Sequence, residues 1–126
     1  MENAYFKDES PKKGSGFIAA IIALILFTIM GIGIDIDQYL QTKDQDLTIP
    51  LWYFYLIFSV DAALILAVIL IYVYRKAGVL LFPIAMALHF FFHLYYLDTF
   101  LYSDVTGLFV FVGGLLAILP KWQFFK

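Results

Sequence analysis

Residues 51–74 read LWYFYLIFSVDAALILAVILIYVY and hold a single charged side chain, Asp61, near their centre. A transmembrane helix needs about 20 consecutive and mostly apolar residues, so this stretch predicts a helix that crosses a membrane. An ionisable side chain at the centre of a bilayer costs about 2.5–3.5 kcal/mol on insertion scales, so it usually has a partner or a function. Asp61 is therefore the first candidate for a functional site.

Three further apolar stretches accompany this one in a chain of 126 residues. The chain is 63% hydrophobic and 14% charged, whereas soluble domains are about 45–50% apolar and 25% charged. We expect helices over about residues 16–34, 51–74, 79–97 and 100–120. The prediction is an all-α, polytopic membrane protein with one domain over residues 1–126, an antiparallel four-helix transmembrane bundle.

The charged residues divide between the two sides of the predicted membrane. One side holds seven of the eight basic residues: Lys7, Lys12, Lys13, Arg75, Lys76, Lys121 and Lys126. The other side holds Lys43 together with Asp35, Asp37, Asp44, Asp46, Asp98 and Asp104. Because cytoplasmic loops carry an excess of Lys and Arg, we expect both termini in the cytoplasm and a location in a bacterial inner membrane. Residues 1–15 then form a flexible cytoplasmic tail, and residues 35–49 form an acidic outer loop.

The first apolar stretch has an alternative interpretation as a secretory signal peptide. It follows a basic flank, and Gly31 and Gly33 have the spacing of a cleavage site. Cleavage would leave three helices in the mature protein. The stretch is long for a signal peptide, so we expect it to remain as the first membrane helix.

The chain's two histidines, His89 and His93, lie one helical turn apart in the third apolar stretch. Asp61 is ~15 Å below the outer end of the second helix, and His89 is ~13 Å below the outer end of the third. Since these helices run antiparallel, Asp61 and His89 can meet at similar depth if both faces turn inward. With His93, Tyr96 and the acidic outer residues they would form a polar ladder that relays protons or binds a cation.

A structural role competes with this hypothesis. A carboxyl group inside a membrane often bonds a polar group on a neighbouring helix and fixes the register of the two, at ~0.6–2 kcal/mol per bond. We expect this role for Asp61, and we predict no catalytic residue. Two histidines and one carboxylate are a minimal set of metal ligands, so we expect no metal and no other cofactor.

Small side chains recur at a spacing of four residues and predict close helix contacts. These residues are Ala19 and Ala23, then Ser59, Ala63 and Ala67, and finally Gly113 and Ala117. Asp61 lies about 200° around the second helix from Ala63, at 100° per residue. Because a charge should not face lipid and a line of small residues is often a helix contact, both faces should be covered. We therefore expect a homo-oligomer or a larger membrane complex.

The layout resembles the DoxX-like family of small four-helix membrane proteins. The resemblance rests on the longer loop after the first helix, Asp61 in the second, the basic turn Arg75-Lys76, and His93 near the outer end of the third. It implies an accessory subunit, because some members of that family are accessory subunits linked to quinone or thiol redox systems. A thiol role does not carry over, since the chain has no cysteine.

Three functional classes follow from these residues. The first is an accessory or scaffold subunit of a membrane complex or homo-oligomer, which the sparse polar content favours and which is not an enzyme. The second is a small proton- or cation-coupled transporter that uses Asp61, His89 and His93. The third is a redox-associated protein that places a quinone near His89. All three have the lipid bilayer as a partner, and none involves nucleic acid.

Overall fold

The structure is a computed structural model that describes residues 12–45, 50–97 and 102–126. Its helices are α1 (Ser15–Gln45), α2 (Leu51–Tyr72), α3 (Lys76–Leu97) and α4 (Tyr102–Ile118), followed by the 3₁₀ helix η2 (Leu119–Phe124). The chain has four candidate spans that are long and apolar enough to cross a membrane. The predicted all-helical class and the four spans are thus confirmed.

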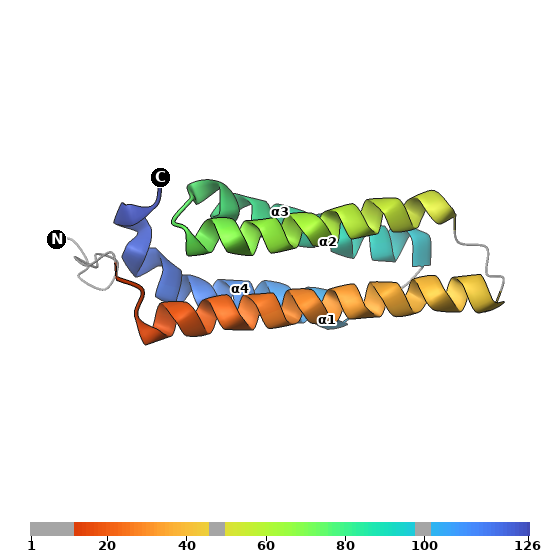
Figure 1. The fold of residues 1–126 in the computed structure, drawn as a ribbon, viewed down its shortest axis with the longest axis horizontal. Coiled ribbons are helices and arrows are strands. Elements are labelled where there is room, and N and C mark those ends of the chain that lie inside the picture. Colours follow the sequence, from red (N-terminus) through yellow and green to blue (C-terminus); the bar gives the residue numbers. More distant parts are fainter. Residues whose placement is uncertain (1–11, 46–49, 98–101) are drawn as a thin grey trace.

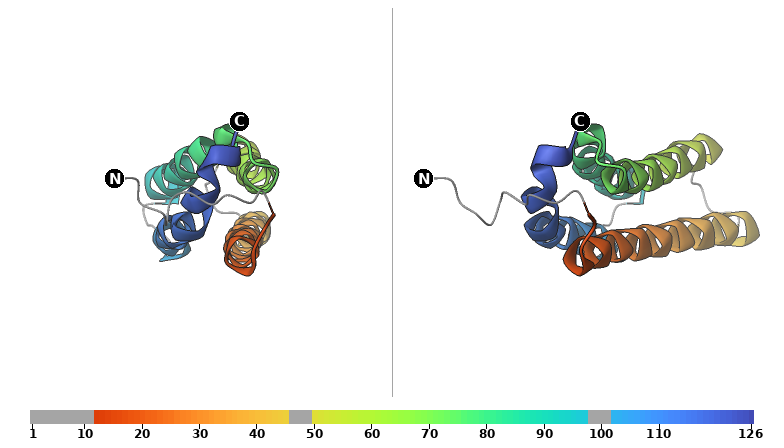
Figure 2. Two further views of the ribbon diagram at one scale, coloured as in Figure 1. Left: turned by 90° about the vertical axis from the view of Figure 1, so that its left-hand side faces the viewer. Right: turned by 60° about the vertical axis from the view of Figure 1, so that its left-hand side comes forward.

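The four helices form an up-and-down bundle in which each helix packs against its neighbours in sequence (Figure 1). Seen from one end, α1, α2, α3 and α4 stand at the corners of a square, with α4 beside α1 (Figure 2). Within the described residues, no Cα atoms of α1 and α3 lie within 8 Å of one another, so these two helices are diagonal partners. Any direct contact between α1 and α3 must therefore come from side chains that reach across the bundle.

The first helix is longer than its sequence suggests. We expected it to end near residue 34 and to be followed by a loop over residues 35–49, but α1 continues to Gln45. Residues 46–49 lie outside the described part of the chain, as does most of the predicted tail, residues 1–11. Each glycine in a helix costs about 1 kcal/mol relative to alanine. Gly31 and Gly33 nevertheless do not break α1, because free backbone groups cost more in an apolar environment.

The turn between α2 and α3 has the backbone pattern of a Schellman motif. Arg75 N–H donates to Leu70 O at 2.8 Å, and Tyr74 N–H donates to Ile71 O at 3.1 Å. Tyr74 has φ 61°, a left-handed conformation that usually requires glycine. Its ring packs on Phe17 and Phe125, with centroids 5.4 and 5.3 Å away, which offsets the strain and joins the turn to both terminal segments.

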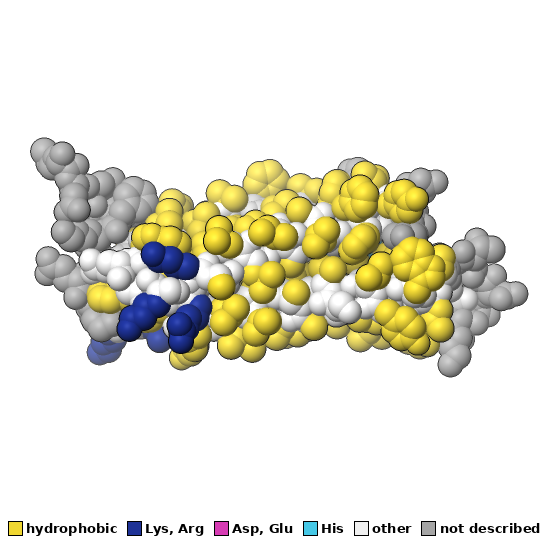
Figure 3. Space-filling model, turned by 90° about the horizontal axis from the view of Figure 1, so that it is seen from above, with side chains coloured by type: hydrophobic (Ala, Val, Ile, Leu, Met, Phe, Trp, Pro, Cys, Tyr) yellow, Lys and Arg dark blue, Asp and Glu magenta, His cyan; other side chains and the backbone are white. Residues whose placement is uncertain are grey.

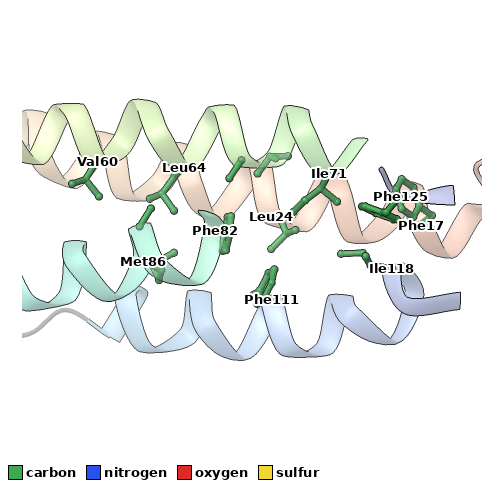
Figure 4. Close-up of a cluster of buried hydrophobic side chains, with 13 residues drawn as sticks. Phe17, Leu24, Val60, Leu64, Ile71, Phe82, Met86, Phe111, Ile118 and Phe125 are labelled. Carbon is green, nitrogen blue, oxygen red and sulfur yellow. The ribbon is translucent and has the colours of Figure 1, made fainter. Parts of the chain in front are cut away.

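An apolar core fills the half of the bundle nearest this turn (Figure 4). Side chains from all four helices meet there, including Leu24, Ile71, Phe82 and Phe111. The rings of Phe82 and Phe111 stack with centroids 5.1 Å apart.

The outer surface is also apolar along most of its length (Figure 3). Leu80, Phe109 and Tyr55 are more than 60% exposed, which is unusual for a soluble protein and suits contact with lipid. Lysine and arginine side chains gather at one end of the face shown. We call this the basic end and define it by Lys12, Lys13, Arg75, Lys76, Lys121 and Lys126. The far end is where α1 finishes and α2 begins.

Not every predicted small-residue contact has the expected partner. Ala67 is fully buried, and a Cβ atom added at Gly78 would lie 2.6 Å from its carbonyl oxygen, so α2 and α3 touch here. Between α1 and α4, a Cβ atom at Gly16 would lie 3.8 Å from Ala117 Cβ. The remaining predicted positions lie at the surface or only partly buried: Ala19, Ala23, Ser59, Ala63 and Gly113.

Candidate functional site

Two histidines of α3 share one carboxyl group of α1. His89 Nε2 lies 2.7 Å from Asp35 Oδ2, and His93 Nε2 lies 2.8 Å from Asp35 Oδ1. Asp35 and His93 are both 0% exposed. These bonds cross the diagonal of the bundle, so they join two helices whose backbones do not touch.

Asp61 of α2 completes a group of four side chains. Its Oδ1 atom lies 3.1 Å from His89 Nε2, and the residue is only 3% exposed. Neither Asp61 oxygen has a hydrogen-bond partner among the described residues, so this contact is an approach of charged groups only. We call Asp35, Asp61, His89 and His93 the Asp–His cluster. It brings together three of the four helices.

Helical spacing places these residues on inward faces. Asp35 follows the buried Thr28 by seven residues, which is about two turns and therefore the same side of α1. His89 and His93 follow Ala85 at intervals of four, and Ala85 is buried. The two imidazole rings consequently lie on one face of α3 and meet edge to face, with centroids 4.2 Å apart and planes inclined by 76°.

The cluster is bordered by a small cavity on one side and by an apolar cluster on the other. On the side facing the basic end, a small cavity of about 10 Å³ is lined by Phe27, Thr28, Gly31, Asp61, Leu64, Met86 and His89. Such a volume is at the lower limit for one water molecule. On the side facing the far end, Tyr53, Phe54 and Ile57 form a second buried cluster, against which Tyr39, Phe58 and Phe92 pack. The four polar side chains are therefore enclosed.

The position along the bundle follows from helix geometry. Asp35 lies ten residues before the end of α1, and Asp61 lies ten residues after the start of α2. Both are ~15 Å from the far end at 1.5 Å per residue. Asp35 is twenty residues from the start of α1, or ~30 Å from the basic end. The site is therefore nearer to the far end of the bundle.

Of the residues expected at a site, the structure brings Asp61, His89 and His93 together. The Tyr96 side chain lies outside the described part of the chain. Asp35 was assigned to the outer loop, and this is wrong because the residue belongs to α1 and is buried. Its seven-residue spacing from Thr28 was a usable signal, but the glycines at positions 31 and 33 favoured an earlier helix end.

The arrangement suits proton exchange as well as cation binding. Ionised Asp35 accepts a hydrogen bond from each imidazole, so both Nε2 atoms are donors when the rings are neutral. The carboxyl group of Asp35 and the two Nε2 atoms also form a group whose ligand atoms all lie within 4.8 Å of one another. Neutral imidazole and carboxylate are common metal ligands in proteins. These three side chains could therefore hold a metal ion.

Among the side chains that the structure describes, no lysine or arginine balances the charge of the Asp–His cluster. The lysines and arginines whose side chains the structure describes gather at the basic end, ~30 Å away along α1. Two carboxyl groups buried among apolar helices are costly unless they are protonated, paired with an imidazolium or bound to a cation. The cluster therefore has the composition of a site that takes up positive charge.

Comparison of the chain with known protein families, with curated proteins and with solved structures finds no match. The resemblance to the DoxX-like family stays a prediction. The argument for function therefore rests on the geometry of the Asp–His cluster and on the shape of the bundle.

Proposed function

We propose that this chain is a small multi-pass membrane protein that acts as a proton- or cation-coupled transporter and loads its cation at the Asp–His cluster. The observation that carries the proposal is the position of His89 Nε2, 2.7 Å from an Asp35 oxygen and 3.1 Å from an Asp61 oxygen. When the proton of the neutral His89 ring is on Nδ1, its Nε2 atom can accept a proton from one carboxyl group and deliver it to the other. A series of neighbouring ionisable side chains inside the membrane marks the proton pathway of many transporters.

The order of the polar side chains supports loading from the far end, where the second buried cluster of Tyr53, Phe54 and Ile57 would have to part. His93 lies one turn closer to that end than His89, and Gln38 and Thr42 continue the inward face of α1 beyond Asp35. In the opposite direction, the path ends at the apolar core around Leu24, Leu64 and Phe82. Transfer across the membrane then requires the helices to part at this core, as transporters do when they alternate access. A bacterial inner membrane with the basic end in the cytoplasm is the location that the charge distribution favours.

Proton flux into liposomes tests this function. The purified chain is reconstituted, a potassium diffusion potential is applied, and an internal pH-sensitive dye is followed for the wild type, Asp61→Asn and Asp37→Asn. We expect flux in the wild type and its loss in Asp61→Asn, which keeps the shape of the side chain but cannot carry the charge. Asp37 is exposed two residues from Asp35, so Asp37→Asn is the matched control and should retain flux. Wild-type flux no greater than that of empty liposomes overturns the transporter.

An accessory or scaffold subunit is the second candidate, and a groove on the bundle surface favours it. The groove has a volume of about 290 Å³ and lies between α2 and α3. Its lining is almost entirely apolar and includes the small side chains of Ser59 and Ala63. Small residues at a surface let a further helix approach closely. This candidate predicts absent flux together with a large complex on a native gel of detergent-extracted membranes. Migration as a free monomer contradicts it.

A further inference from the structure

We infer that the Asp–His cluster is a binding site for one divalent transition-metal ion, with zinc as the representative case. His89 Nε2, His93 Nε2 and a carboxyl oxygen of Asp35 supply three ligand atoms that lie within 4.8 Å of one another, and Asp61, 3.1 Å from His89 Nε2, would move in as the fourth. This inference rests on the proposed function in using the same four side chains, and it names the chemical class of the cation. Its supports are the converging donor atoms, the Asp61 oxygens without partners and the adjoining cavity.

The donor atoms are close to a metal geometry but are now joined by hydrogen bonds. In a tetrahedral zinc site with bonds of about 2.0–2.1 Å, the ligand atoms are ~3.3–3.4 Å apart. The Nε2 atoms of His89 and His93 are 2.7 and 2.8 Å from their Asp35 oxygens. Opening each pair by ~0.6 Å would admit the ion in place of the two shared protons.

Asp61 is the one member of the Asp–His cluster whose burial no hydrogen bond in the described structure compensates. It is 3% exposed, both of its oxygens lack a hydrogen-bond partner in the described residues, and it borders the cavity beside His89. A buried carboxyl group in this position costs free energy unless a cation or a proton neutralises it. A bound dication would use this free coordinating group, and its charge would match the two carboxylates.

The donor set selects the class of metal. Imidazole suits zinc, iron, copper and nickel, whereas magnesium and calcium prefer sites made entirely of oxygen atoms. Soft ions such as Cu(I) favour thiolate or thioether ligands. The chain has no cysteine, and the one methionine at the cavity, Met86, comes from the core side rather than from the group of donors. A first-row divalent ion bound by two imidazoles and two carboxylates is therefore the best fit.

The test is a metal titration of the purified chain in detergent, without a histidine tag, after treatment with a chelator. The only native histidines are His89 and His93, so removing the tag leaves no competing imidazole. Zinc binding is followed by calorimetry, and cobalt binding is followed by its visible absorption, which reports four-coordinate geometry. Magnesium and calcium titrations test the selectivity. We expect one zinc ion per chain and an intense cobalt spectrum.

Three variants connect the signal to the cluster. Outer-shell partners alone change metal affinity by about 10- to 100-fold, so loss of a direct ligand in His93→Ala should weaken zinc binding by at least ~100-fold. Asp37→Asn should bind as the wild type does. If His93→Ala fails to fold, the zinc affinity of Asp61→Asn is the deciding measurement. This variant removes a proposed ligand without removing a hydrogen bond. Equal zinc affinity in Asp61→Asn and the wild type, or no saturable binding by the folded wild type, overturns the inference.

Metal binding and transport can fail separately. Stoichiometric zinc binding without proton or zinc flux supports the metal site and overturns the transporter. Proton flux that depends on Asp61, in a chain that binds no zinc or cobalt, supports the proton-coupled transporter and overturns the metal site.

Discussion

Asp35 is the residue on which the candidate site depends. One carboxyl group receives a hydrogen bond from each of two buried imidazoles, and all three side chains are almost completely excluded from the surface. In a medium of low polarity, a buried donor that loses its acceptor costs about 1–3 kcal/mol. Asp61, in contrast, makes one contact of 3.1 Å and no hydrogen bond in the described structure. The two aspartates should therefore differ in their effect on stability.

Asp35→Asn should lower the free energy of unfolding by about 1–3 kcal/mol, because an amide presents a donor to one of the two imidazole donors. Asp61→Asn should have a smaller effect. The measurement is unfolding in mixed micelles of mild detergent and SDS, with chelator present so that metal binding does not contribute. Asp37→Asn, on the exposed side of the same helix, should change stability by less than ~0.5 kcal/mol. Equal losses for Asp35→Asn and Asp37→Asn would contradict a structural role for the shared carboxyl group.

At the level of the helices, the α2–α3 hairpin is held by a close backbone approach. A Cβ atom at Gly78 would lie 2.6 Å from Ala67 O and 2.7 Å from Ile71 N. Both are backbone atoms, so a new side chain cannot be accommodated by a change of rotamer. Gly78 therefore permits the contact that aligns His89 with Asp61 further along the same pair of helices.

Gly78→Ala should destabilise the bundle by about 1–3 kcal/mol, the usual cost of forcing extra atoms into a packed contact. Gly113→Ala is the matched control, since an added Cβ there meets nothing within 4 Å. Alanine is a better helix former than glycine by about 0.8–1.0 kcal/mol, so this control should be neutral or stabilising. Unfolding in mixed micelles measures both variants. A Gly78→Ala chain as stable as wild type would show that α2 and α3 do not approach so closely.

The helix boundaries show how well the sequence alone predicts where each helix begins and ends. α2, α3 and α4 begin and end within three residues of the predicted positions, because long apolar stretches and the basic turn mark them clearly. α1 extends eleven residues beyond its predicted end, from residue 34 to Gln45. Local signals at Gly31 and Gly33 indicated an end, but the buried contacts of Asp35 with α3 favour continuing the helix. Contacts made across the bundle override local preference here.

At the level of the whole molecule, the lysine and arginine side chains that the structure describes gather at one end of a bundle whose surface is otherwise mostly apolar. The terminal segments meet there, since Lys121 Nζ donates to Lys12 O at 2.6 Å and Lys126 N donates to Tyr74 O at 2.8 Å. If the positive-inside rule holds, this end faces the cytoplasm and the Asp–His cluster lies nearer to the outer surface. A cation would then enter from outside the cell.

The orientation is testable because the chain has no cysteine, so a single introduced thiol is unique. Gln41→Cys, on the exposed surface of α1 near the far end, should react with an impermeant maleimide added to intact cells. Lys126→Cys at the basic end should react only after the membrane is permeabilised. The reverse pattern of labelling would place the Asp–His cluster nearer to the cytoplasm and reverse the direction of loading.

The sequence by itself determined that four helices of membrane-spanning length exist, where three of them begin and end, and that basic residues gather on one side. Those properties depend on the composition of continuous stretches. Only the tertiary structure decided that Asp35 belongs to the site, which faces of α2 and α3 turn inward, and that the cluster bridges diagonal helices. The physical reason is that lipid and the protein interior are both apolar, so helices such as α2 are apolar on all sides and their rotation leaves no periodic pattern to read.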